Sequence, residues 1–295
     1  MKLLMVFLCS LLFYPSQNLP AKVSQSFDEK DERVIRLTLD PDKPENDSAI
    51  GENDLGKEEL YPTDQILKIN SQFEGNEFED VSIIFGDIAV YKGLGNAHKC
   101  LFNTCRWPKS RNGKVYIPYQ LSSSFRRSDR QVILGAMKAI EKVTCIQYRQ
   151  RKKQKNYLSI TPRTGCWSFV GRQLGGQDLS LGTGCVYHGI VQHELLHALG
   201  FHHEQCRSDR NKFVRIYFKN IKEGREGNFK RLNTNNLGTR YDYGSIMHYG
   251  KNAFSKNGKP TILPKPNPNI PIGQRLGLSR TDIKKINKLY KCRMA

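Results

Sequence analysis

The feature that most constrains the fold of this chain is the twelve-residue string HELLHALGFHHE, which begins at His193. Residues four apart lie on one face of an α-helix, so His193 and His197 can direct two imidazoles at one ion. Gly200 can adopt a positive φ and let the chain leave the helix, which brings His203 back toward the same ion. The chain must therefore fold around a helix that ends in a glycine turn beside a metal.

The donor set and its neighbour predict a zinc peptidase. Three neutral imidazoles favour Zn²⁺ with one open position, where a bound water reaches a pKa of about 7. Glu194 flanks that water as a general base, since it lies about 100° round the helix from His193. The short HExxH pattern also occurs in ordinary helices. The longer HExxHxxGxxH pattern followed by a methionine turn, here Ser245-Ile246-Met247-His248-Tyr249, is far more specific.

Several further motifs stand in a fixed order around this string. They are Gly165-Cys166-Trp167-Ser168, Gly184-Cys185-Val186, the continuation of the zinc string through Arg210, and Tyr241-Asp242-Tyr243-Gly244 before the methionine turn. With these motifs the sequence resembles the astacin zinc endopeptidases over nearly everything from Asn96 to Cys292. The resemblance implies a metzincin zinc-protease fold and one Zn²⁺ per chain.

The resemblance also implies roles for individual residues. Tyr249 is expected to be an additional, displaceable zinc ligand that swings away to hydrogen-bond the tetrahedral intermediate. Met247 is expected beneath the metal, where an apolar floor has no chemistry of its own. Glu204 is expected to pair with the α-ammonium of the mature chain at Asn96, because a buried carboxylate needs a cationic partner.

Local patterns predict an α+β architecture, with a mixed sheet, two long helices over an active-site cleft and a looser lower half. Ser128 can cap a helix that runs through Val143, and Ser279 with Asp282 forms a capping box for a last helix. The zinc helix is expected over 189–199. Alternating β-branched and aromatic residues predict strands over 114–119, 144–148, 157–161 and 167–170, and the Asn, Gly and Pro content of 233–271 predicts irregular structure.

Charge divides the chain. Residues 1–95 hold nine Lys and Arg against 18 Asp and Glu, whereas the remaining residues hold 38 against ten, a formal net charge of +28. The apolar run from Leu3 to Tyr14 is too short to span a bilayer and is typical of a secretory signal. The stretch from Asp28 to Glu59 is acidic and poor in aromatics, as in a solvated segment. We therefore expect a signal peptide over 1–20, an acidic propeptide over 21–95 and a catalytic domain over 96–295, with no membrane span.

A latency switch is expected in the acidic part. Ile83-Ile84-Phe85-Gly86-Asp87 resembles the astacin pro-segment motif Phe-x-Gly-Asp, whose aspartate takes the zinc position that the catalytic water needs. By this resemblance Asp87 is a zinc ligand in the latent form only. Ile84 departs from the pattern, since it stands where the family has its Phe. The alternative is an ordinary turn aspartate after a glycine.

Of eight cysteines, Cys9 lies in the predicted signal. The family pattern implies the disulfides Cys145–Cys292 and Cys166–Cys185, with Cys100–Cys105 as the extra bridge of the six-cysteine astacins, a subgroup that includes fish hatching enzymes. Sequence alone leaves fifteen connectivities open for six cysteines. Cys206 is left over, as an unpaired or intermolecular thiol.

The expected function is that of a secreted zinc endopeptidase of the hatching-enzyme type, stored in secretory granules, that digests egg-envelope glycoproteins. The alternatives are a six-cysteine astacin of digestive or immune tissue, or a basic matrix-binding protein on a protease fold. The basic run from Arg149 to Lys155 is either a solvated face or part of a field that attracts acidic matrix. We expect a monomer, an activating protease as a partner, and no nucleic-acid binding, because no readout motif is present.

Overall fold

The computed structural model describes residues 62–72, 80–92 and 105–293. The predicted signal peptide, the acidic stretch Asp28–Glu59, the predicted mature start at Asn96 and Cys100 lie outside these residues. Within them, no helix is both long and apolar enough to cross a membrane.

A mixed sheet forms one half of the catalytic part. In the described residues its seven strands lie in the order β1-β2-β6-β7-β5-β3-β4. Strand β5 is parallel to β3 and β7, β3 is parallel to β4, and β6 is antiparallel to β7. The strands are β1 Val81–Ile84, β2 Ile88–Tyr91, β3 Val115–Leu121, β4 Ile146–Gln150, β5 Tyr157–Thr161, β6 Cys166–Phe169 and β7 Gly176–Leu181. The four predicted strands are thus present within one or two residues, and β7 is an additional one.

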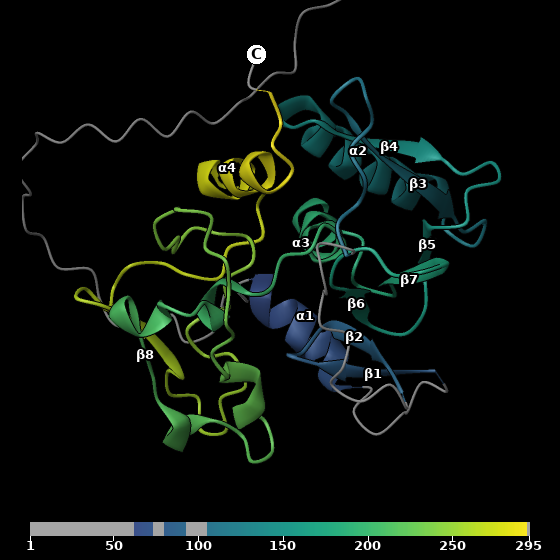
Figure 1. Cartoon of the computed structure of the whole chain (residues 1–295). Helices are drawn as coiled ribbons and strands as arrows, with labels where there is room; N and C mark the ends of the chain where they lie inside the picture. Colours follow the sequence, from purple (N-terminus) through teal and green to yellow (C-terminus); the bar gives the residue numbers. More distant parts are fainter. Residues whose placement is uncertain (1–61, 73–79, 93–104, 294–295) are drawn as a thin grey trace, which may run out of the picture. The chain divides into compact units, whose positions relative to one another are not determined.

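Helix α2 (Arg127–Val143) packs against α3 (His188–Ala198) and the sheet (Figure 1). Its buried face consists of Ile133, Ala136, Met137 and Ile140. The prediction of Ser128 as its cap was wrong. The helix begins earlier because Asp129 accepts a hydrogen bond from the Arg126 amide at 3.2 Å and forms an ion pair with the Arg126 guanidinium.

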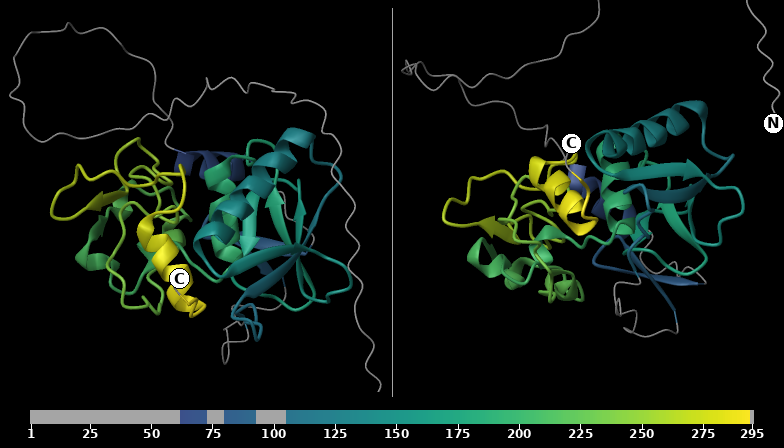
Figure 2. Two further views of the ribbon diagram at one scale, coloured as in Figure 1. Left: turned by 90° about the horizontal axis from the view of Figure 1, so that it is seen from above. Right: turned by 45° about the horizontal axis from the view of Figure 1, so that its top comes forward.

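The second half is rich in loops, as predicted. Its regular elements are short 3₁₀ turns, the two-stranded pair β8 (Val214–Ile216) and β9 (Ile262–Pro264), and α4 (Arg280–Leu289). The Ser279–Asp282 capping box of α4 is confirmed. A separate apolar cluster, including Phe229, Tyr249 and Ile262, supports this half. Both views in Figure 2 show α3 between the sheet on one side and the loop-rich half on the other.

The predicted propeptide contributes ordered structure that the sequence did not reveal. Helix α1 (Pro62–Ser71) buries Ile66 in the main core and Leu67 in the core of the loop-rich half, so it lies where the two halves meet. Strands β1 and β2 form an antiparallel hairpin, and β2 adds in parallel to β6. The hairpin thereby extends the sheet of the catalytic domain.

Two disulfides join the pairs implied by the family pattern, Cys145–Cys292 and Cys166–Cys185. Cys105 is also disulfide-bonded, whereas its predicted partner Cys100 lies outside the described residues. Cys206 is a free, buried thiol, and burial raises its pKa to about 12. Such a thiol is poorly accessible and mostly protonated at neutral pH, which argues against the intermolecular alternative.

Candidate zinc centre

Three histidines and one aspartate meet where α3 faces the hairpin turn. Nε2 of His193 lies 3.0 Å from Asp87 Oδ2, and Nε2 of His203 lies 3.0 Å from Asp87 Oδ1. Nε2 of His197 lies 3.1 Å from Nε2 of His193. All four side chains are buried, and their ligand atoms lie within 4.8 Å of one another. The structure thus brings together the three predicted histidines and the predicted switch aspartate.

Helix α3 and the turn after it produce this convergence. His193 and His197 are one helical turn apart, and the helix ends at Ala198. Gly200 has a φ of 103°, as predicted, which is a conformation that residues with a side chain rarely adopt. The chain therefore reverses direction within a few residues and places His203 opposite the helix.

The hydrogen bonds of the far ring nitrogens fix the tautomers. Nδ1 of His193 donates to the carbonyl of Ile246 at 2.8 Å, and Nδ1 of His197 donates to the carbonyl of Phe201 at 2.8 Å. A carbonyl can only accept, so Nδ1 carries the proton and a neutral ring directs its Nε2 lone pair at the centre. Burial holds the pKa of His193 well below 6.5 and lowers that of His203.

These donors fit Zn²⁺. Two unprotonated nitrogens 3.1 Å apart, beside a carboxylate, repel one another unless a cation lies between them. Burial raises the pKa of Asp87, but its electrostatic interaction with His203 and its contacts with the three histidines outweigh burial and hold that pKa well below 3.8. Three imidazoles and a carboxylate oxygen form a donor set that zinc prefers.

Glu194 occupies the position expected of a general base. It follows His193 on α3 and is fully buried, and both its carboxylate oxygens lack a hydrogen-bond partner within the described residues. Burial, reinforced by the negative charge of Asp87, raises its pKa well above 4.5. Such an unpartnered carboxyl group is expected where a water or substrate must bind.

Asp87 reaches the centre from the tight turn between β1 and β2. Gly86 has a φ of 82°, and a Cβ there would lie 2.6 Å from Leu67, so the turn requires glycine. Ile84, where the family has its Phe, is 38% exposed at the end of β1. The departure from the pattern therefore leaves the placement of Asp87 unaffected.

Tyr249 is held by the same turn. Its buried hydroxyl donates a hydrogen bond to the carbonyl of Phe85, and its ring centroid lies 4.6 Å from that of His203. In this structure the hydroxyl is thus engaged with the β1–β2 turn, whereas the described side chains that group as a metal site are those of Asp87 and the three histidines.

The methionine turn and Glu204 lie behind the histidines. Met247 is buried in the main core, and its carbonyl accepts a hydrogen bond from the Glu204 amide at 3.0 Å. The Glu204 carboxylate lies 2.5 Å from Lys285 Nζ and 3.2 Å from Arg207. Asn96 lies outside the described residues. In this structure Glu204 has two cationic partners, neither of which the sequence indicated.

Arg275 is a further charged residue that sequence reasoning missed. It is buried, its guanidinium donates to the carbonyl of His248 at 3.0 Å, and its Nε lacks a described partner. Burial lowers its pKa to about 10. Asp87 and Glu194 raise the pKa of Arg275, whereas burial lowers it. The positive charge of Arg275 therefore stabilises the anionic forms of both carboxylates in turn. No local pattern marks one arginine among so many basic residues.

Comparison with known proteins identifies relatives of this arrangement. A family model described as Astacin, a peptidase family, matches residues 103–291, more than half of the chain. High choriolytic enzyme 2 of Oryzias latipes is 49% identical over 220 residues, which cover 74% of this chain and 78% of the relative. Low choriolytic enzyme of the same fish is 44% identical over 246 residues, which cover 82% of this chain and 90% of the relative.

A solved structure shares the fold. It is that of high choriolytic enzyme 1, described as a hatching enzyme zinc-protease from the medaka fish Oryzias latipes. Its similarity has a TM-score of 0.65 at 52% identity and covers 67% of this chain and 100% of that chain. The α+β metzincin fold predicted from the sequence is therefore confirmed.

Proposed function

Because this chain belongs to the astacin family, and is thus a zinc-dependent endopeptidase that acts on proteins, we propose that it is a secreted, hatching-enzyme-like protease made as a latent zymogen. In this proposal residues 1–20 direct export, residues 21–95 form the inhibitory propeptide and residues 96–295 form the active enzyme. The observation that carries the proposal is the insertion of Asp87, on a segment preceding the catalytic domain, among three histidines.

The catalytic roles follow from the positions of the side chains. His193, His197 and His203 hold the zinc, which when bound polarises the scissile carbonyl and lowers the pKa of a water. Glu194 accepts the proton of the attacking water and passes it to the departing amine. Tyr249, released from Phe85, donates a hydrogen bond to the oxyanion that develops on the carbonyl.

Latency has a geometric basis. The carboxylate of Asp87 stands where the catalytic water must enter, and the hairpin that carries it pairs with β6 at the edge of the sheet. Both the water position and the sheet edge become available only when this segment leaves. An activating protease is therefore required as a partner.

The relatives suggest the substrate. High and low choriolytic enzymes are the names of fish proteins that share nearly half of their residues with this chain over most of its length. An egg envelope of acidic glycoproteins also suits a mature domain with a formal charge of +28. We therefore favour an egg-envelope matrix over a digestive or immune substrate.

The substitution Glu194→Gln tests the chemistry. It preserves the size and burial of the side chain but removes the base, so the activated enzyme should retain zinc and lose about 10²–10⁴-fold in kcat. Zinc content and peptide hydrolysis are measured on the same preparation. Glu223→Gln, at an exposed position, is the matched control. Near-normal turnover in Glu194→Gln would exclude the assigned base.

The substrate proposal has a separate test. The activated enzyme is incubated with isolated fish egg envelopes and with an unrelated extracellular matrix, and released peptides are measured. Preferential solubilisation of the egg envelope supports the hatching role. Equal or greater release from the other matrix would assign the enzyme to another tissue function and leave the zinc peptidase chemistry intact.

A further inference from the structure

The turn that carries Asp87 has a strained backbone. Phe85 and Gly86 have φ values of 48° and 82°, so two successive residues lie in the left-handed region. Residues with a side chain rarely adopt this conformation, and it persists where the surrounding structure holds it. The position of Asp87 among the histidines therefore depends on the groups that fix this turn.

Each carbonyl group of the turn, residues 85–87, accepts a hydrogen bond from a different element. The first accepts from the Tyr249 hydroxyl, and the third accepts from the Ser168 amide of β6 at 3.1 Å. The middle carbonyl, that of Gly86, accepts from Nδ2 of Asn70 on α1 at 2.7 Å. Tyr249 and Ser168 lie in the proposed catalytic domain, whereas Asn70 lies in the proposed pro-segment.

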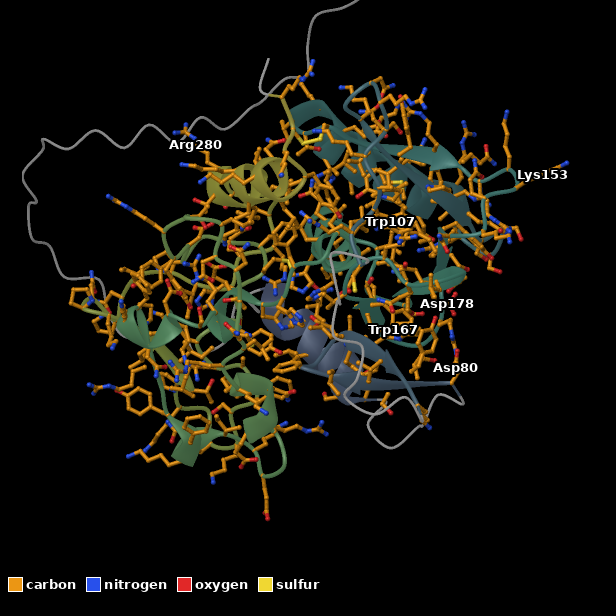
Figure 3. The ribbon with its side chains drawn as sticks, viewed as in Figure 1. Asp80, Trp107, Lys153, Trp167, Asp178 and Arg280 are labelled. Carbon is orange, nitrogen blue, oxygen red and sulfur yellow. A yellow bond between two sulfur atoms is a disulfide. The ribbon has the colours of Figure 1, made fainter. Side chains whose placement is uncertain are left out.

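Asn70 also binds the backbone of β6. Its Nδ2 donates to the carbonyl of Cys166 at 2.7 Å, and its Oδ1 accepts from the Cys166 amide at 2.8 Å. The opposite orientation of the side-chain amide would place its oxygen against two carbonyl oxygens. The register of β2 with β6 begins at Ser168, so Asn70 serves a residue that precedes this pairing. A Cβ at Gly165 would lie 2.6 Å from Oδ1, so this glycine leaves room for the amide. Trp167, the next residue of β6, marks the place of the strand in Figure 3.

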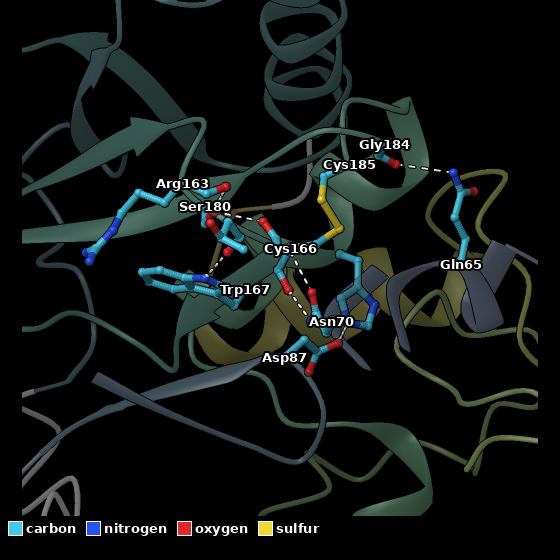
Figure 4. Close-up of a disulfide and its surroundings, with 12 residues drawn as sticks. Gln65, Asn70, Asp87, Arg163, Cys166, Trp167, Ser180, Gly184 and Cys185 are labelled. Carbon is cyan, nitrogen blue, oxygen red and sulfur yellow. Dashed lines mark hydrogen bonds and ion pairs between the residues drawn. A yellow bond between two sulfur atoms is a disulfide. The ribbon is translucent and has the colours of Figure 1, made fainter. Parts of the chain in front are cut away.

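Helix α1 rests on a covalently closed loop of the catalytic domain. Near its start, Nε2 of Gln65 donates to the carbonyl of Gly184 at 3.2 Å, and near its end Asn70 binds Cys166. The disulfide Cys166–Cys185 joins these two contact points. Figure 4 shows Gln65 directed at Gly184 and Asn70 directed at Cys166 on either side of the disulfide. The helix therefore presents Asn70 to the turn from a fixed base.

We propose that Asn70 is a positioning residue of the latent form, the Asn70 latch, which couples helix α1 to the turn that carries Asp87. The inference rests on the proposed latency and deepens it, since Asp87 blocks the centre and Asn70 keeps Asp87 there. Without the side-chain amide, the Gly86 carbonyl loses its donor and the strained turn has one fewer tie. The fraction of molecules in which Asp87 has left the histidines then rises, and the activity of the uncleaved protein rises in proportion.

The test measures hydrolysis of a small peptide by uncleaved proteins, whose intact mass is confirmed after the assay. Asn70→Ala should raise the residual activity about 10-fold over uncleaved wild type, since each hydrogen bond typically contributes a factor of about 2 to 12. Asn70→Asp has nearly the same shape, but its carboxylate faces two carbonyl oxygens. It should therefore raise the residual activity further.

Hydrogen exchange gives a readout that does not depend on zinc. In uncleaved Asn70→Ala, the amides of residues 81–91 and of Ser168 should exchange about 10-fold faster than in wild type. The amides of β5, which lies inside the sheet, should keep their wild-type rates. A general loss of stability would instead accelerate exchange in both regions.

Two controls accompany these variants. Gln65→Ala removes the other hydrogen bond of α1 but leaves the bond from Asn70 to Gly86 in place. It should raise the activity of the uncleaved protein less than about threefold. After complete activation, all variants should cleave the peptide at the wild-type rate, because residues 65 and 70 lie in the segment that is removed.

The outcomes separate the latch from the proposed function. If neither Asn70 variant raises peptide hydrolysis and hairpin exchange, or if Gln65→Ala raises them as much, Asn70 is not a latch. Activity in uncleaved Asp87→Ala would then still support the proposed latency. If Asn70→Asp fails to fold, Asn70→Ala decides the question. If activated wild type cleaves no peptide, the proposed protease activity fails first.

Discussion

The carboxylate of Asp87 is the residue on which latency depends. Its oxygens lie 3.0 Å from the Nε2 atoms of His193 and His203, in the place that the catalytic water would need, and its negative charge would favour a cation held by the same histidines, so its contribution is steric as well as electrostatic. Asp87→Ala should therefore give an uncleaved protein with measurable peptidase activity, because the water position opens. The check is hydrolysis of a small peptide by uncleaved wild type and variant. Asp80→Asn, which alters another carboxylate of the same hairpin, should remain silent. Equal silence in Asp87→Ala would mean that the pro-segment inhibits by covering the cleft.

His248 should make the fold sensitive to mild acid. Its Nδ1 donates to the carbonyl of Tyr249 and its Nε2 accepts from the hydroxyl of Tyr241, each at 2.7 Å, and burial lowers its pKa to about 3. Between pH 6.5 and about 3 the unfolded chain binds a proton at this residue and the folded chain does not. Stability should thus fall with decreasing pH, by up to about 1.4 kcal/mol per pH unit from this group.

Denaturant unfolding at pH 7 and pH 5 measures this effect. His248→Gln, which has no titrating ring, should show a smaller loss of stability between the two values than wild type. The other buried histidines, including His193, His197 and His203, contribute equally to the pH dependence of stability in both proteins, so their effect cancels in the comparison. An unchanged loss in the variant would show that His248 is protonated in the fold.

At the level of single residues, prediction from sequence was limited to those with a fixed spacing. The spacing of His193, His197, Gly200 and His203 is dictated by helix geometry, and the structure places all four as expected. Arg275 and Lys285 have no such signal. They reach the site through long-range packing, and their residue type is common on the basic surface of this chain.

Helix α4 is connected to His193 through a series of hydrogen bonds. Asp282 accepts from the hydroxyl of Ser245 at 2.6 Å and from the Ile246 amide at 3.0 Å, and the Ile246 carbonyl accepts from His193. The capping box that sequence analysis identified thus has a second role, because the capping carboxylate also fixes the methionine turn. A local pattern can reveal the cap but not the partner that tertiary packing brings to it.

This connection predicts a loss of zinc affinity in Asp282→Asn. The side-chain amide of Asn would place an N–H donor opposite Ser245 or Ile246, whose hydroxyl and backbone amide are also donors. The loss of such a hydrogen bond should loosen the turn behind His193. Outer hydrogen-bond partners of metal ligands typically contribute about 10–100-fold in affinity. Competition with a chelator on the activated enzyme measures it. Ser279→Ala weakens the same helix cap but leaves the turn contacts in place, so it should release zinc much less. Similar losses in both variants would assign the effect to helix stability.

Elements were predictable where their pattern is long. Helices α2, α3 and α4 and strands β3 to β6 follow the expected periodicity to within one or two residues. The hairpin strands β1 and β2 have four residues each, too few for alternation to be distinguished from chance. Their existence depends on pairing with β6, which lies some eighty residues further along the chain.

The distribution of charge over the catalytic domain gives the last prediction. The end of β4 and the connection after it carry Arg149, Arg151, Lys152, Lys153 and Lys155, and Lys153 marks the position of this connection on the sheet side in Figure 3. Arg151 stacks on Tyr157 at 3.8 Å, so this connection is partly ordered by its own side chains. If it concentrates the enzyme on acidic matrix, binding should weaken steeply with salt, because the Debye length contracts from about 10 Å at 0.1 M to about 3 Å at 1 M.

Cleavage of a small neutral peptide should depend much less on salt, because it depends on the zinc centre and Glu194. Neutralising the five cations at and after the end of β4 should reproduce the effect of salt on matrix binding and leave peptide cleavage nearly unchanged. The control neutralises five exposed cations of the loop-rich half, Lys212, Arg215, Lys219, Lys222 and Lys230, which lowers the net charge equally. If both variants lose matrix binding alike, total charge drives attachment. If neither does, the basic surface only solvates the protein, and the proposal of an acidic egg-envelope substrate loses its electrostatic support.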